Sequence, residues 1–317
     1  MAALFAAAAF DQYAPFSHLA TTGDGSQVLF ATGFRQRSTD QSLWVMLFRY
    51  GPRGFEILVE RPCPAPFQYG AVCSIPSARI SADGSGITHT GEDCCVGSGQ
   101  RTCGGQVLLS RNGRWLVSFS SPNLMDFRPA EVANDGSLLF TNGTLLRASG
   151  VTEKTTAAGA SAMDDAATIA AGETGGRVFV ADIPSSHARF IGPGTRDDWQ
   201  PRLSADGRWL LYLTRLGETP QAMFSRGDGS DWRQLTDFAE GVREAVLSGN
   251  GRVAWAVTGH NALVRIDTGS GAIDDVIAPS PVLLKAPVLG PGSLALIEGA
   301  GFPAEPTVTL DGRSPPV

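Results

Sequence analysis

The residues with the clearest potential for covalent chemistry are five cysteines, all of which lie between positions 63 and 103. They are Cys63, Cys73, Cys94, Cys95 and Cys103. Thiols at this density commonly link long loops through disulfides in an oxidising compartment. A zinc site that includes His89 is the competing interpretation, but the C-x₂-C pairs that would mark such a site are absent. We therefore predict structural disulfides among these cysteines, with their pairing open and one thiol left over, and no metal site.

The other polar residues form no recognisable catalytic motif. The only two lysines, Lys154 and Lys285, do not complete the Gly-Lys-Ser/Thr end of a phosphate-binding loop. The four histidines are scattered over the chain without metal-binding spacing. Neighbouring acids such as Asp197 and Asp198 would point to opposite faces of a strand, so their adjacency does not predict an acid and base pair. We predict no catalytic residue and no cofactor, and a protein that is not an enzyme.

Composition and charge favour an exported or soluble β-rich chain over a nucleic-acid-binding or membrane-spanning one. The net charge is −6, and no cluster of Lys and Arg is available to replace the counterions of a nucleic acid. The sequence contains no run of 18 or more apolar residues, which is the length needed to span a bilayer. The 38 glycines and 20 prolines suit many short strands joined by tight turns. We therefore expect no nucleic-acid partner and no membrane span.

The elements that must position any site are six similar segments, each with a short apolar run, a turn and a second apolar run. The turns are at Asp24, Asp83, Asp135, Asp165, Asp206 and Asn250. Asp-Gly and Asn-Gly pairs accept the positive φ that tight hairpin turns demand. The turns lie about 45 residues apart on average, which is the length of a four-stranded propeller blade.

The sequences LSADGRWL at 203–210 and ISADG at 80–84 resemble the Ser-Pro-Asp-Gly signature of TolB-like, WD40-like propeller repeats, with Ala in place of Pro. This resemblance covers residues 11–281 and implies an all-β, six-bladed β-propeller. It is weakest in the fourth repeat, where Asp165-Ala166 lacks the glycine. The sequence LSRNGRWL at 109–116 also fits the signature and would allow seven blades. We interpret it instead as the outer hairpin of the second blade, because only 23 residues separate it from the next turn.

The two ends of the chain differ from the repeats. Residues 1–10 are an apolar segment that we interpret as the remnant of a signal peptide. Residues 282–317 resemble the start of an immunoglobulin-like module found at the end of large exported bacterial proteins, and are too few to complete its sandwich. We expect a truncated chain from a bacterial protein exported to the periplasm or beyond the cell.

The candidate binding residues are those that enter or leave the innermost strands at the mouth of the channel. They are His18, Arg79, Arg128, Glu131, Asp198, Trp199, Arg202, Arg243 and Glu244. A rim of mixed charge with one aromatic residue suits a peptide or protein partner. We therefore expect a monomeric, non-enzymatic binding or scaffolding module. The alternatives are a propeller hydrolase or lyase with a site assembled from several blades, and a spacer that presents the C-terminal module.

Overall fold

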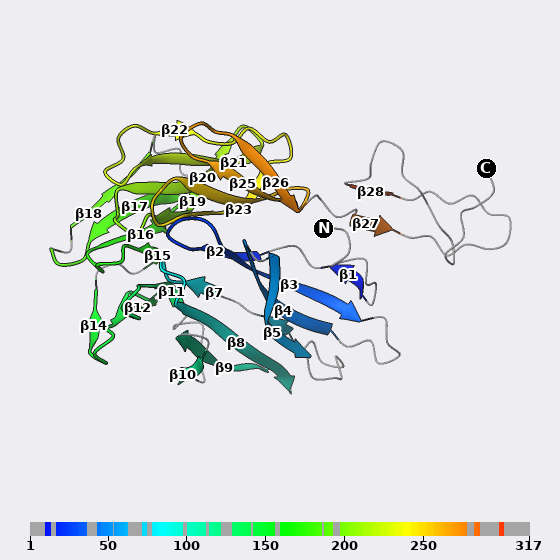
Figure 1. The fold of residues 1–317 in the computed structure, drawn as a ribbon. Helices are drawn as coiled ribbons and strands as arrows, with labels where there is room; N and C mark the ends of the chain where they lie inside the picture. The colour runs from blue at the N-terminus through cyan, green and yellow to red at the C-terminus, as the bar shows by residue number, and fades with distance from the viewer. Residues whose placement is uncertain are drawn as a thin grey trace, which may run out of the picture.

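The chain folds as an all-β propeller (Figure 1). The structure is a computed structural model, and it describes residues 10–13, 17–36, 43–52, 54–62, 72–74, 78–97, 100–111, 114–121, 129–140, 142–155, 159–185, 187–192, 197–277, 282–285 and 298–300. These residues form six antiparallel sheets of four or five strands and one sheet of two strands.

The first three sheets occupy the N-terminal half of the chain. The first contains β1 (Phe10–Tyr13), β2 (Ser17–Thr21), β3 (Val28–Gln36), β4 (Leu43–Gly51) and β5 (Gly54–Pro62). The second contains β6 (Val72–Ser74), β7 (Ala78–Ile80), β8 (Gly86–Gly97), β9 (Gln100–Arg111) and β10 (Arg114–Ser121). The third contains β11 (Pro129–Val132), β12 (Leu138–Phe140), β13 (Thr144–Leu146) and β14 (Thr152–Lys154).

The next three sheets have four strands each, in sequence order. The fourth contains β15 (Ala160–Met163), β16 (Ile169–Thr174), β17 (Arg177–Asp182) and β18 (Ala188–Phe190). The fifth contains β19 (Asp198–Leu203), β20 (Trp209–Leu216), β21 (Thr219–Arg226) and β22 (Arg233–Gln234). The sixth contains β23 (Val242–Leu247), β24 (Val253–Thr258), β25 (Leu263–Asp267) and β26 (Ile273–Ile277).

The inner strands of the six sheets follow one another around a common axis. β2 contacts β7, β7 contacts β11, and the series continues through β15, β19 and β23, which contacts β2 again. Figure 1 shows the result, with β23 of the sixth sheet beside β2 of the first. Segments more than 220 residues apart in sequence therefore meet where the ring closes.

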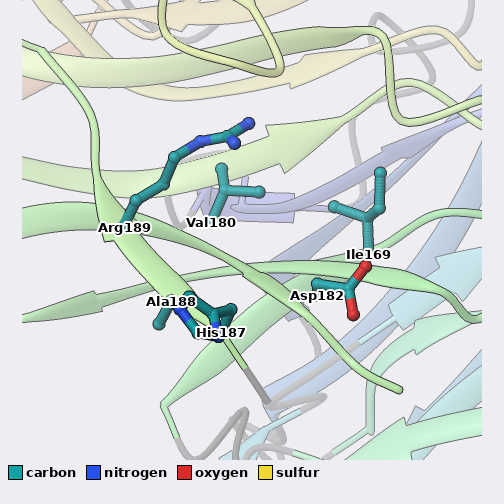
Figure 2. A pocket seen from close by; sticks show the side chains of 6 residues that line it. All are labelled: Ile169, Val180, Asp182, His187, Ala188 and Arg189. Carbon is teal, nitrogen blue, oxygen red and sulfur yellow. The ribbon is translucent and has the colours of Figure 1, made fainter. Parts of the chain in front are cut away.

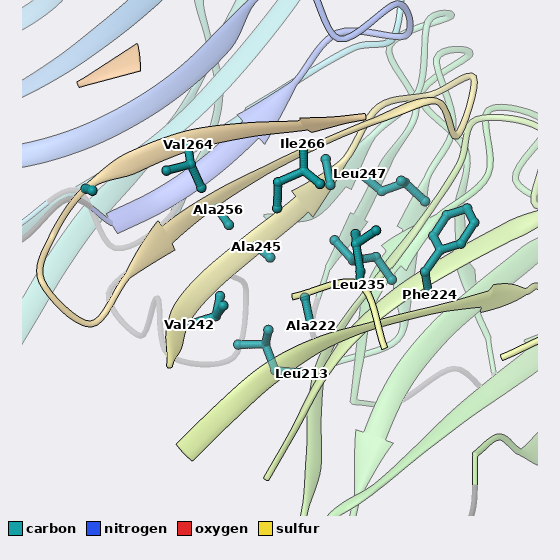
Figure 3. Close-up of a cluster of buried hydrophobic side chains, with 13 residues drawn as sticks. Leu213, Ala222, Phe224, Leu235, Val242, Ala245, Leu247, Ala256, Val264 and Ile266 are labelled. Atoms are coloured by element: carbon teal, nitrogen blue, oxygen red, sulfur yellow. The ribbon is translucent and has the colours of Figure 1, made fainter. Parts of the chain in front are cut away.

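Apolar side chains between neighbouring sheets form the core. Figure 3 shows the cluster between the fifth and sixth sheets, which includes Leu213, Phe224 and Val264. The cluster between the sixth and first sheets includes Phe30 and Trp255. Trp255 is 2% exposed, and its indole N–H donates to the Gly25 carbonyl across the ring closure at 3.0 Å.

The turn after each inner strand is fixed by a short set of side-chain bonds. In the second sheet the Ser81 hydroxyl donates to Asp83 at 2.7 Å and accepts from the Gly86 N–H at 2.8 Å. The Ser85 N–H also donates to Asp83 at 2.9 Å, and Gly84 takes a φ of 75°. A carboxylate or hydroxyl that accepts local backbone bonds holds such a turn without help from the core.

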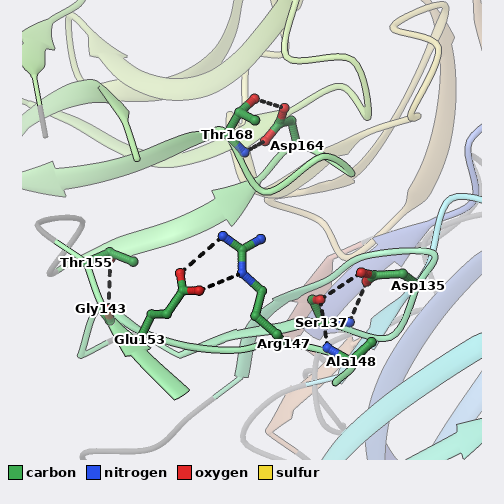
Figure 4. Close-up of polar contacts among 9 residues, drawn as sticks. All are labelled: Asp135, Ser137, Gly143, Arg147, Ala148, Glu153, Thr155, Asp164 and Thr168. Atoms are coloured by element: carbon green, nitrogen blue, oxygen red, sulfur yellow. Dashed lines mark hydrogen bonds and ion pairs between the residues drawn. The ribbon is translucent and has the colours of Figure 1, made fainter. Parts of the chain in front are cut away.

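The fourth turn corrects the alignment predicted from sequence, because it lies one residue later than the Asp165-Ala166 pair. Asp164 occupies the position of Ser81, and its carboxylate accepts the N–H of Thr168 at 2.7 Å (Figure 4). It also accepts the N–H of Ile169 at 2.8 Å. Ala167 takes the left-handed φ of 51° that glycine takes elsewhere. The Asp164 carboxylate therefore holds a turn that lacks both the Asp or Asn and the Gly of the other five turns.

Two further predictions can be compared with the strands. β9 and β10 pair from Arg111–Arg114 onward within the second sheet, so LSRNGRWL is the outer hairpin of that sheet, as predicted. In the C-terminal segment only β27 (Val282–Lys285) and β28 (Glu298–Ala300) are described, as a two-stranded sheet. The other residues of the predicted immunoglobulin-like module, and residues 1–9 of the predicted signal remnant, lie outside the described residues.

Candidate functional site

One end of the propeller axis is closed by hydrogen bonds between successive turns. The bonds run around the whole ring: Gly23 N–H to Ala82 O, Asp83 N–H to Asn134 Oδ1, Asn134 Nδ2 to Asp165 Oδ2, Asp165 N–H to Ala205 O, Ala205 N–H to Gly249 O, and Asn250 N–H to Gly23 O. Each bond joins a turn of one sheet to a turn of the next. The six turns are therefore tied into one continuous rim.

Small residues allow these turns to meet at the axis. A Cβ added at Gly249 would lie 2.8 Å from Gly23 Cα, 3.0 Å from Ala205 Cβ and 3.2 Å from Ala82 Cβ. These residues come from the sixth, first, fifth and second sheets, on both sides of the ring. A larger side chain at Gly249 therefore has no room, and this end of the channel is blocked by backbone and Cβ atoms.

A small cavity lies on the axis above the closed end. Its volume is about 30 Å³, and it is lined by Leu19, Ala20, Thr21, Arg79, Ile80, Glu131, Arg202, Leu203, Val246 and Leu247. A volume of this size holds about one or two water molecules. The cavity combines an apolar wall with two guanidinium groups and one carboxyl group from three different sheets.

Arg202 on β19 is buried beside this cavity and forms few hydrogen bonds. The residue is 8% exposed, and its Nη1 donates to the main-chain oxygens of Ser161 and Pro201 at 3.0 and 3.1 Å. Its Nε has no hydrogen-bond partner, and no carboxylate among the described residues forms an ion pair with it. Burial and the nearby charge of Arg79 lower the pKa of the Arg202 guanidinium to about 10, although the carboxylates of Glu244 and Glu131 oppose this shift.

Glu131 on β11 faces the same two cations. Burial raises the pKa of its carboxyl group, and the charges of Arg79 and Arg202 act in the opposite direction. Its Oε1 accepts the N–H of Val132 at 3.2 Å. Arg79 on β7 is 9% exposed, and its Nη1 donates to the Ala78 carbonyl at 2.7 Å. The cavity therefore holds two buried cations and one carboxyl group whose ionisation burial disfavours.

Glu244 and His18 lie farther from the turns than the cavity does, because they are nearer the starts of their inner strands, which run toward the turns. The two carboxylate oxygens of Glu244 on β23 accept the N–H groups of His18 and Leu19 on β2 at 2.8 and 2.7 Å. His18 has a φ of 58°, which a non-glycine residue rarely adopts. With this φ at His18, two consecutive N–H groups of β2 donate to one carboxylate, so Glu244 links the sixth sheet to the first.

The remaining predicted mouth residues do not join this group. Asp198 is fully buried, and its N–H donates to the Gly176 carbonyl of the fourth sheet at 3.0 Å. Trp199 packs against the cluster between the fifth and sixth sheets. Arg243 is exposed, with Nη1 3.4 Å from Asn261 Oδ1. Arg128 lies outside the described residues.

The cysteines are described only through their backbone. In the antiparallel pairing of β8 with β9, Cys94 is the direct partner of Cys103, and Cys95 is the partner of Thr102. Cys73 on β6 is the partner of Asp93, next to Cys94 along β8. Cys63 lies outside the described residues. The second sheet therefore brings at least one pair of the predicted disulfide cysteines into register.

Sequence reasoning missed two features of the molecule. The first is the closed end, whose signal was the Gly or Ala before the turn Asp or Asn in four repeats. The second is a surface pocket of about 180 Å³ in the fourth sheet, shown in Figure 2 and lined by Ile169, Val180, Asp182, His187, Ala188 and Arg189. Arg189 also donates through Nη2 to the Gly227 carbonyl of the fifth sheet at 3.1 Å. Nothing in the repeat pattern marks these residues.

The described part of the chain contains no group of three or more His, Cys, Asp or Glu side chains placed to hold a metal ion. Within the same ranges, no helix is long and apolar enough to cross a membrane.

Comparison with solved structures gives likenesses of fold. The tricorn protease matches with a TM-score of 0.53 and 15% identity, over 87% of this chain and 27% of that chain. This chain thus spans about a quarter of the tricorn chain. A putative TolB from Agrobacterium tumefaciens matches with a TM-score of 0.39 and 17% identity, over 95% and 91% of the two chains. TolB from Acinetobacter baumannii matches with a TM-score of 0.34 and 12% identity, over 82% and 53%. No protein-family model matches the chain, and no curated protein matches its sequence.

Proposed function

We propose that the chain is a six-bladed TolB-like propeller of an exported bacterial protein, and that it binds a peptide or protein partner at the open mouth of its channel without catalysing a reaction. The observation that carries this proposal is the shape of the channel. One end is blocked by the tied turns, and above them Arg79, Glu131 and Arg202 converge on a cavity of about 30 Å³. A partner therefore has one approach to these charges.

The six blades are supported by the sheets and by their order around the axis. Each of the six sheets contributes one inner strand, and each inner strand contacts the next in a closed series. The turns repeat this order in a second closed series of hydrogen bonds. Two independent rings with the same order favour six blades over seven.

The size and chemistry of the cavity favour binding over a hydrolase or lyase with a site inside the channel. A cavity that admits one or two waters has no room for an organic substrate, whereas ligand pockets usually measure hundreds of Å³. Glu131 is the one carboxyl group among its lining residues, so a second acid or base would have to come from the partner or from elsewhere. A partner that covers the mouth and inserts one side chain fits this geometry better.

Peptide selection tests the proposal directly. Peptides displayed on phage would be selected on the intact protein, and their affinities measured for wild type, R202M and E131Q, with R147M as the matched control on the outer part of the third sheet, where Arg147 pairs with Glu153. We expect at least one selected class to lose affinity tenfold or more with R202M and to be unchanged by R147M. Selected peptides that all ignore R202M and E131Q would contradict binding at the channel mouth. Turnover of a model ester, peptide or glycan that disappears in E131Q would favour the enzyme instead.

The proposed export is tested by a thiol count. Protein recovered from an oxidising compartment would be denatured and its thiols counted before and after reduction. Two disulfides predict one free thiol that rises to five. Five free thiols throughout would argue against export.

A further inference from the structure

We propose that the axial cavity is a binding site for one carboxylate group, received by the Arg202 guanidinium beside Arg79. This inference deepens the proposed function, because it names the chemistry that the channel mouth selects. The carboxylate has two sources, a small free acid or an acidic side chain or C-terminus of the partner. Both present the same planar anion to the cavity.

The Arg202 guanidinium has unmet hydrogen-bonding capacity. A guanidinium has five N–H donors, and here only Nη1 forms hydrogen bonds, both with neutral carbonyl oxygens. The Nε–H is buried without a partner. Buried charges are normally paired, since an unpaired one loses its hydration without compensation. An anion beside Nε would provide the missing acceptor together with a counter-charge in direct contact with the guanidinium.

The two nearby carboxyl groups do not pair with Arg202. Glu244 accepts other hydrogen bonds, and burial disfavours the anionic form of Glu131. Glu244 uses both oxygens for the N–H groups of His18 and Leu19. Glu131 lines the cavity, but its burial favours the neutral acid. Neither forms an ion pair with Arg202 in the described structure. Burial, and after it the positive charge of Arg79, lowers the pKa of the Arg202 guanidinium.

The volume of the cavity also favours a carboxylate over a larger anion. A cavity of about 30 Å³ accommodates one carboxylate, and a bulky tetrahedral phosphate fits it less well. The walls of Leu19, Val246 and Leu247 exclude water around the ion and strengthen its attraction to the guanidinium. The closed rim of turns leaves the open mouth as the approach, which is where a side chain of a docked partner would enter.

The test uses sodium formate as the probe and the Arg202 Nε–H resonance of the full chain as the readout, assigned by its loss in R202M. We expect a saturable shift of this resonance with a Kd below about 10 mM. E131Q should bind formate no more weakly than wild type, because its amide is uncharged and burial already disfavours the anionic form of Glu131. R147M should bind as wild type does, because Arg147 pairs with Glu153 on the outer part of the third sheet. An Arg202 signal that formate does not move, or an E131Q variant that binds more weakly, would overturn the proposal.

Two further arms separate the sources of the carboxylate. Peptides ending in a free carboxylate would be compared with their C-terminal amides, and Asp-containing peptides with Asn-containing ones, in competition with formate. Competition by the acidic forms alone supports a partner carboxylate. Formate binding with no peptide competition supports a small free acid, and in that case the carboxylate site stands while the proposed peptide-binding function fails. R202M is expected to fold, since it replaces an unpaired buried charge by an apolar side chain of similar length, and urea unfolding checks this.

Discussion

Glu244 should stabilise the closed ring by joining the sixth sheet to the first, and substituting it tests whether these two sheets are joined. The carboxylate on β23 accepts two N–H groups from β2, at 2.8 Å from His18 and 2.7 Å from Leu19. Each is a hydrogen bond to a charged group, which contributes about 1.5–3 kcal/mol. Leu19 is fully buried, so its N–H would lack an alternative partner in water.

The expected magnitudes follow from these two bonds. E244Q keeps one amide oxygen and loses the charge, so we expect the free energy of unfolding to fall by about 1.5–3 kcal/mol. E244A removes both acceptors and should lower the free energy of unfolding by about 3–6 kcal/mol. The matched control is E153Q, because Glu153 pairs with Arg147 on the exposed outer strands of the third sheet at 3.1 Å (Figure 4). Such surface pairs contribute about 0–1 kcal/mol.

Urea unfolding followed by circular dichroism measures these differences. The midpoint should move while the m-value stays constant, since the surface exposed on unfolding is the same. If E244Q destabilises the protein no more than E153Q does, Glu244 does not hold β2 against β23, and the reasoning on ring closure is refuted.

Three other expectations follow from the same structure. G249A should lower the free energy of unfolding by about 1–3 kcal/mol, because the added Cβ would lie 2.8 Å from Gly23 Cα. G269A is the control, since the Cβ added there meets only a side-chain oxygen at 3.3 Å. Equal urea midpoints for the two variants would contradict the closed axis. The backbone N–H of Ser26, hydrogen-bonded to Asp24, lowers the pKa of that carboxyl group below 3.8, so its ionised form stabilises the fold above about pH 4 and this contribution is lost as the pH falls through the lowered pKa. D24N should therefore unfold less steeply on acidification than wild type, and identical pH profiles would refute this role. Peptide mapping of unreduced protein should recover a linked Cys94–Cys103 peptide, because these residues are direct cross-strand partners; recovery of other pairs alone would exclude that register.

The positions of the turns could be predicted because their chemistry is local. Asp83-Gly84 and its equivalents accept positive φ and bond to nearby hydroxyl groups, and both properties can be recognised from residue types. The fourth turn could not be placed correctly, because the Asp164 carboxylate replaces a serine and Ala167 replaces the glycine. The stabilising bonds survive there while the residue types change.

The candidate site was predictable only in part, for a reason that lies in the inner strands. Arg79, Glu131 and Arg202 stand at the same distance before their turns, so the repeat alignment brings them together. Trp199, nearer the mouth, was misplaced because a bulge shifts the register between Trp199 and Arg202. A bulge changes which face a side chain occupies, and simple alternation along a strand does not reveal it.

β2 must be an integral part of the closed ring for the buried charges to lie inside a channel. Hydrogen exchange of the native protein, read by amide-resolved mass spectrometry or NMR, tests this directly. We expect the amides of His18 and Leu19 to exchange as slowly as those of Val242–Leu247, because they open only when the ring unfolds. Fast exchange of β2 beside a protected β23 would contradict the closed propeller and the site built on it.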